Sequence, residues 1–153
     1  MNIKTAEFNL AGYQMIEEIA RSSKIVVYRA LVNGLELESN HSTVIIKLFS
    51  SADPTSQELV NFCNQYTISK NMELPGVLQV FSLEEYNYLS QRGYALIMED
   101  FGGVSLDLYD RDYTLSLADV LNIAIQLADT LHEIGKQRII HKEIGRASCR
   151  ERV

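Results

Sequence analysis

The sequence lacks the features that mark several large classes of protein. Its two cysteines, Cys63 and Cys149, are too few and too widely spaced for a disulfide framework or a close-spaced metal pair. The longest uninterrupted apolar runs, such as residues 44–46 and 95–98, are far shorter than the roughly 20 residues that a membrane-spanning helix needs. The first residues show no signal-peptide pattern. We therefore expect a cytoplasmic protein in a reducing compartment, with no membrane partner.

Positive charge is also scarce. The chain has 14 lysines and arginines against 20 aspartates and glutamates, a net charge of −6, and no basic cluster before residue 146. Because nucleic-acid binding needs clustered lysine and arginine, this balance argues against nucleic acid as the main partner. The length of 153 residues, with 46% hydrophobic and 22% charged side chains, is typical of one globular domain.

The last residues, 143–153, differ in composition from the rest of the chain. They bring three of the 14 basic residues and one of the two cysteines into a short polar stretch. The string resembles the translation of a widely used sequencing adapter that begins at the second base of the Glu143 codon. A natural basic tail is the alternative. We treat 143–153 as a probable non-native tail and leave it out of the fold.

Short alternating stretches predict an antiparallel sheet at the start of the chain. Apolar and polar residues alternate over 13–19, 25–31 and 43–49, and Asn33-Gly34 is a strong hairpin signal. The polar segment 35–42 lengthens the second hairpin, which a surface loop tolerates. We therefore expect three antiparallel strands.

A helix and two more strands are expected next. Ser51-Ala52-Asp53-Pro54-Thr55 is a helix-start signature, since Ser51 or Asp53 can cap free amides and Pro54 suits the first turn. Pro75-Gly76 is a stop signal. Strands are predicted over 77–86 and 94–99. The apolar residues at helical spacing in the first helix are Leu59, Phe62, Tyr66 and Met72. Together these elements predict an α+β fold.

A second, longer helix is predicted over 117–134, with a broad apolar stripe typical of a well-buried helix. A helix of this kind needs a second body of protein to cover it. Since only 135–142 remain before the adapter-like tail, we expect the chain to be part of a larger fold.

Two short motifs, together with this order of elements, resemble the protein kinase domain. Val44-Ile45-Ile46-Lys47 is similar to the Val-Ala-Ile-Lys motif of the third kinase strand, and residues 139–142 resemble the start of the catalytic loop. The resemblance covers 13–142. It implies a five-stranded antiparallel N-lobe with one helix. The expected divisions are an extension at 1–12, an N-lobe and hinge at 13–101, and the start of a truncated C-lobe at 102–142.

In this family the lysine of the third strand contacts the phosphates of ATP, a role that falls here to Lys47. A glutamate on the following helix normally holds that lysine, and Gln65 stands in its place. An amide can still hydrogen-bond the lysine, but without charge-assisted strength. Two alternatives stay open: an outward-facing Lys47 on an amphipathic strand, and Glu58 or Glu73 as the true partner.

The resemblance also implies further nucleotide contacts, and it is weakest in the loop that would cover the phosphates. Ala20, Ser22 and Ile25 stand where the phosphate-covering loop would have its three glycines. Glycines let backbone amides approach phosphate closely, so their absence weakens this cover. The expected cofactor contacts are Ala20, Ser22, Val27, Ile45, Lys47, the gatekeeper Met98, and the backbone of Glu99 and Phe101.

No metal ligand is expected in this chain. Asp100-Phe101-Gly102 spells the magnesium-binding motif but precedes the catalytic loop, so Asp100 receives no magnesium role. His141 opens the catalytic loop in a structural role. The aspartate that should follow Lys142 is replaced by Glu143, whose first codon base is also that of aspartate. Magnesium would therefore be bound only in the parent protein.

The resemblance implies the ATP-binding half of a signalling protein serine/threonine kinase, inactive as a fragment. Three short segments of the sequence, 12–14, 99–103 and 139–142, resemble the kinase module of large bacterial multi-domain sensor kinases. This resemblance implies further signalling domains in the parent. A pseudokinase or nucleotide-binding interaction module is the alternative suggested by Gln65 and the absent glycines. An unrelated α+β domain is a third reading, in which Lys47 and Gln65 would not meet.

Overall fold

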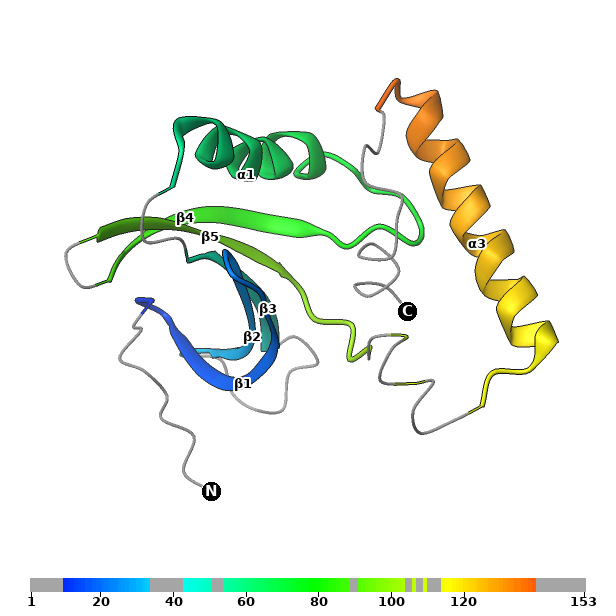
Figure 1. The fold of residues 1–153 in the computed structure, drawn as a ribbon, viewed down its shortest axis with the longest axis horizontal. Helices are drawn as coiled ribbons and strands as arrows, with labels where there is room; N and C mark the ends of the chain where they lie inside the picture. The colour runs from blue at the N-terminus through cyan, green and yellow to red at the C-terminus, as the bar shows by residue number, and fades with distance from the viewer. Residues whose placement is uncertain are drawn as a thin grey trace. The chain divides into compact units, whose positions relative to one another are not determined.

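The structure, a computed structural model, describes residues 10–33, 43–50, 54–88, 91–103, 106, 109 and 114–139. The elements, in chain order, are β1 (Tyr13–Arg21), β2 (Ile25–Val32), β3 (Thr43–Phe49), α1 (Ser56–Ser69), β4 (Val80–Tyr88), β5 (Gln91–Glu99) and α3 (Leu117–Lys136) (Figure 1). They fall into two compact units. The first comprises Met1–Met72 and Leu78–Asp100, and the second Glu73–Val77 and Phe101–Val153.

The first unit is a five-stranded antiparallel sheet with one helix. The strand order is β1-β2-β3-β5-β4, so β3 lies in the centre and is paired on both sides. The predicted order of three strands, one helix and two strands is confirmed, and so is the α+β class. The hydroxyl of Tyr13 on β1 donates to Glu84 on β4 at 3.0 Å. This contact between the two edge strands shows that the sheet curls strongly.

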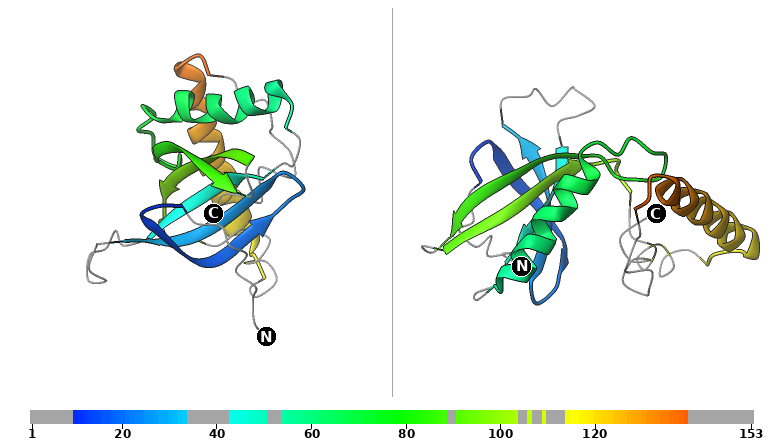
Figure 2. Two further views of the ribbon diagram at one scale, coloured as in Figure 1. Left: turned by 90° about the vertical axis from the view of Figure 1, so that its left-hand side faces the viewer. Right: turned by 90° about the horizontal axis from the view of Figure 1, so that it is seen from above.

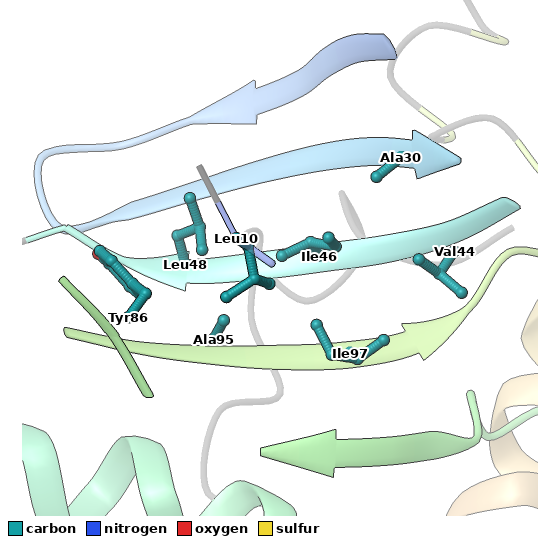
Figure 3. Packing of buried hydrophobic residues seen from close by; sticks show 8 residues of the cluster. All are labelled: Leu10, Ala30, Val44, Ile46, Leu48, Tyr86, Ala95 and Ile97. Atoms are coloured by element: carbon teal, nitrogen blue, oxygen red, sulfur yellow. The ribbon is translucent and has the colours of Figure 1, made fainter. Parts of the chain in front are cut away.

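One face of the sheet carries the larger hydrophobic core. Alternation along β3 sends Val44, Ile46 and Leu48 into this core. The buried hydroxyl of Tyr86 donates to the carbonyl of Phe49 at 2.7 Å, which satisfies the one polar group of that ring. Figure 3 shows the side chains of this cluster, which are Leu10, Ala30, Val44, Ile46, Leu48, Tyr86, Ala95 and Ile97.

Helix α1 covers the opposite face, and the views in Figure 1 and Figure 2 show it lying along the sheet. Its Phe62 is 1% exposed and meets Phe49 of β3 with ring centroids 5.4 Å apart. Val80 and Leu96 complete the buried part of this second core. An aromatic pair of this kind fixes both the position and the rotation of the helix on the sheet.

Helix α1 is capped within the predicted start segment, 51–55, but the predicted capping residue is wrong. The N-cap is Thr55, whose hydroxyl accepts from the Glu58 amide while the Glu58 carboxylate accepts from the Thr55 amide. This reciprocal capping box satisfies two amides at once, whereas the predicted caps Ser51 and Asp53 lie outside the described residues. Pro54 precedes the cap instead of sitting in the first turn.

Other boundaries also differ from the prediction. Helix α1 ends at Ser69, before the expected stop at Pro75-Gly76, and Met72 is buried beyond the helix. Strand β4 begins at Val80 and β5 at Gln91. The polar segment 35–42 lies outside the described residues.

In the second unit, α3 has its own capping box between Ser116 and Asp119. The helix is where the sequence predicts it, and much of its apolar stripe is exposed, as expected of a helix that needs a second body of protein to cover it. Leu117 is 75% and Ile125 58% exposed, and Ile134 is the buried residue among those described in this helix. None of the described helices is long and apolar enough to cross a membrane.

A close approach within the second unit requires glycine. Gly76 has a φ of +79°, and a Cβ added there would lie 2.5 Å from Oγ1 of Thr130 on α3. That hydroxyl also lies 3.4 Å from the carbonyl of Pro75, to which it donates. Both the backbone conformation and the space therefore exclude a side chain at residue 76.

Truncation of Phe62 tests the packing of α1. Phe62→Ala is expected to lower the free energy of unfolding by about 3–5 kcal/mol, because it removes a fully buried ring and leaves a cavity. Val60→Ala is the control, since Val60 is on the same helix but 51% exposed, and it should change the value by less than about 0.5 kcal/mol. Urea denaturation measures both. Equal effects of the two substitutions would contradict the described packing.

A second test concerns the ion pair between Lys24, in the turn after β1, and Glu58 of α1. The hydrogen bond from Lys24, followed by the one from the Thr55 backbone, lowers the pKa of Glu58. A lowered folded-state pKa gives stability that is present at neutral pH and is lost as pH falls through that pKa. Lys24→Met should therefore raise the pKa of Glu58 toward its ordinary value and reduce this acid-labile contribution.

Carboxyl titration by NMR measures the change. Glu133 is the internal control, because Lys136 lowers its pKa in the same way on a different helix. The pKa of Glu133 should stay constant in Lys24→Met. A Glu58 pKa that also stays constant would show that Lys24 is not its partner in solution.

Candidate functional site

Lys47 and Gln65 meet on the face of the sheet that α1 covers. The Nζ of Lys47, on β3, donates to Oε1 of Gln65, on α1, at 3.3 Å. Glu58 is instead engaged by Lys24, and Glu73 lies in the second unit. Within the described residues, no carboxylate pairs with Lys47. The amide therefore orients the ammonium group without neutralising its charge.

An apolar surface surrounds this lysine. In antiparallel pairing, directly opposite residues point to the same face. Ala20 is opposite Val27, Val27 is opposite Lys47, and Ile45 is opposite Met98. All five therefore share the α1 face, with Val27, Ile45 and Met98 half-buried. The arrangement places an apolar area beside the ammonium group of Lys47.

The turn between β1 and β2 is closed by a serine side chain. Oγ of Ser22 accepts from the amides of Ile25 at 3.0 Å and Lys24 at 3.4 Å, and the Ser22 amide donates to the Ile25 carbonyl at 2.8 Å. Among the described residues, the non-glycine residue with positive φ is Arg138, so this turn forms without a left-handed residue. The amides that a glycine loop would offer to an anion are thus already bonded here.

The end of β5 carries the predicted hinge. The Glu99 amide donates to the Gln79 carbonyl at 2.9 Å, and the Gln79 amide donates to the Glu99 carboxylate at 3.2 Å. Because the Glu99 amide is already hydrogen-bonded, the Glu99 carbonyl is the backbone group that could accept a hydrogen bond from a base. Phe101 belongs to the second unit, with its side chain 54% exposed. Its predicted contact with the same base stays a prediction.

Asp100 forms an ion pair that the sequence did not reveal. Its side chain is 5% exposed, and its Oδ2 accepts from Nε of Arg29, on β2, at 2.8 Å. Arg29 is 71 residues away in the sequence, so no local pattern indicates the pair. No group of three or more His, Cys, Asp or Glu side chains in the described parts of the chain could hold a metal ion. His141 lies outside the described residues.

A protein-family model matches most of this chain. The match is to the family described as protein tyrosine and serine/threonine kinase, over residues 13–149. It begins at the first residue of β1, includes every helix and strand described above, and extends beyond Lys142 into the adapter-like stretch. No curated protein matches the chain. The family match covers most of the sequence and agrees with the five-stranded sheet and its helix, and the chain therefore belongs to the protein tyrosine and serine/threonine kinase family.

Proposed function

We propose that this chain is the ATP-binding part of a protein serine/threonine kinase that acts in cytoplasmic signal transduction. The observation that carries the proposal is the meeting of Lys47 and Gln65 beside the half-buried residues Val27, Ile45 and Met98. A purine base needs an apolar surface, and a phosphate chain needs a fixed positive charge. Both are present on one face of one sheet.

The spacing along β3 suits a nucleotide. Ile45 and Lys47 are two residues apart on the same face, which is about 7 Å along a strand. In the proposed site, the base packs on Val27 and Ile45 under Met98, and the ammonium group of Lys47 attracts the phosphates. Gln65 limits where that ammonium group goes. The lysine is a compact point charge on a long stem, which suits a phosphate contact.

We assign no phosphate transfer to the chain by itself. Glu143 follows Lys142 where the family has its catalytic aspartate, and no Asp-Phe-Gly sequence follows within the 153 residues. The described residues do not fit a magnesium ion either, since they contain no ligand cluster and Asp100 is paired with Arg29. The metal, the catalytic base and further signalling domains are proposed for the parent protein.

A pseudokinase is the second candidate, favoured by the phosphate end of the site. Gln65 gives Lys47 a neutral partner, and the Ser22 hydroxyl occupies amides that would otherwise face phosphate. Such a module would bind nucleotide weakly, without transfer, and would act through its partners. The Ser/Thr kinase remains the first proposal because the lysine, its helix partner and the apolar surface are all in place.

Nucleotide binding tests the site directly. Lys47→Ala is expected to weaken ATP binding about tenfold or more, because a hydrogen bond to a charged group contributes about 1.5–3 kcal/mol. Lys70→Ala is the matched control, since it removes the same charge from the exposed end of α1. Isothermal titration calorimetry with ATP measures both. Magnesium should leave the affinity unchanged, because the described residues offer the ion no ligand cluster.

Two outcomes would contradict the proposed site. One is a chain that shows no ATP binding at millimolar nucleotide. The other is equal binding by the chain and by Lys47→Ala.

The intact gene separates the kinase from the pseudokinase. If the parent is an active kinase, an aspartate follows His141-Lys142, and an asparagine and an Asp-Phe-Gly motif follow downstream. These residues orient the substrate hydroxyl and hold magnesium, so their presence predicts transfer of the γ-phosphoryl group to serine or threonine. Sequencing the gene across codon 143 supplies the answer. Any other residue at position 143 in the intact gene would remove the catalytic claim and leave the pseudokinase.

A further inference from the structure

The ion pair between Arg29 and Asp100 joins β2 to the point where the chain leaves the sheet. Strand β5 ends at Glu99, and Asp100 is the next residue. The Asp100 carboxylate is almost fully buried, and Nε of Arg29 donates to it at 2.8 Å. A carboxylate withdrawn from water depends on such a charge-assisted bond. Loss of Arg29 would therefore destabilise the backbone around Asp100 more than most surface substitutions would.

The pair lies at the edge of the proposed base-binding surface. Arg29 is directly opposite Ile45, and Ile45 is directly opposite Met98. Arg29 is also two residues from Val27 on the same face of β2. The residues after Asp100 include Gly102, with a φ of +72°, and Gly103. Asp100 is thus anchored to β2 shortly before two glycines in the chain.

Arg29 has a second, weaker partner. Its Nη1 donates to Oε2 of Glu17, on β1, at 2.6 Å, but the Glu17 side chain is 56% exposed. An exposed ion pair contributes little, because water screens it. The planar guanidinium group can serve both carboxylates at once, whereas the single ammonium group of a lysine cannot match that geometry.

We propose that Arg29 is a positioning residue for nucleotide binding. By holding Asp100, it fixes the exit of β5 and with it the Glu99 carbonyl, which is the group available to the exocyclic amine of adenine. The effect on adenine rests on the proposed function. The effect on the end of β5 does not, so the two parts can fail separately.

Amide hydrogen exchange tests the anchoring. The Glu99 amide is the reporter, because its bond to the Gln79 carbonyl lies at the end of β5. Arg29→Met and Asp100→Asn are each expected to speed its exchange about tenfold or more relative to the Ile46 amide at the sheet centre. Asp100→Asn removes the charge with little change in shape, so it provides the test if Arg29→Met does not fold. Arg29→Lys should restore only part of the protection.

Glu17→Gln is the matched control, since it removes the exposed partner of the same guanidinium group. Its Glu99 protection should equal that of the unchanged chain. The anchoring role is overturned if the Glu99 and Ile46 amides lose protection equally in Asp100→Asn, because that would be a loss of overall stability. It is also overturned if Glu17→Gln has the same effect as Asp100→Asn.

Binding of adenosine and of ATP tests the consequence for nucleotide. Asp100→Asn should weaken both ligands by the same factor, because it acts at the base, whereas Lys47→Ala should weaken ATP alone. Lost protection at Glu99 with unchanged adenosine affinity would overturn the nucleotide role of Arg29. A chain that binds neither ligand, yet loses Glu99 protection in Asp100→Asn, would overturn the proposed function and leave the anchoring intact.

Discussion

The register of β3 is the constraint on which the rest of the structure depends. This strand is paired on both sides, and its alternation divides its side chains between two cores. Val44, Ile46 and Leu48 enter one core, while Ile45 and Lys47 face α1. A slip of one residue would place Lys47 in the larger core and expel three apolar side chains from it. The hydrophobic pattern of one strand therefore directs the charge of the site.

The second partner of the site is placed by an apolar contact. Phe62 packs against Phe49, and Gln65 is three residues further along α1, on neighbouring positions of the helix surface. The rotation that buries Phe62 therefore carries Gln65 toward Lys47, at 3.3 Å. An amide here keeps the geometry of the pair while leaving the lysine charge uncompensated. This explains how a neutral residue occupies the glutamate position without disturbing the fold.

The sequence predicted what depends on local patterns and missed what depends on register. Alternation located β3 to the residue. The family resemblance predicted Gln65 as the partner of Lys47, and Nζ of Lys47 donates to Oε1 of Gln65 at 3.3 Å. The cap of α1 was misplaced because Ser51 and Asp53 are also residue types that commonly cap helices. The reciprocal capping box between Thr55 and Glu58 selects Thr55 instead. The bond between Arg29 and Asp100 requires the pairing of three strands, so no short window of sequence contains it.

The two ends of the proposed nucleotide surface are supported unequally. At the phosphate end, the Ser22 hydroxyl holds the turn amides, and Gln65 of α1 orients Lys47 of β3. At the base end, the half-buried apolar residues adjoin a partly buried ion pair that joins β2 to the exit of β5. Such a pair adds little net stability over an apolar replacement, but it fixes one geometry. In the proposed function, the chain would therefore select its ligand mainly by the base, and the phosphates would contribute chiefly through one lysine.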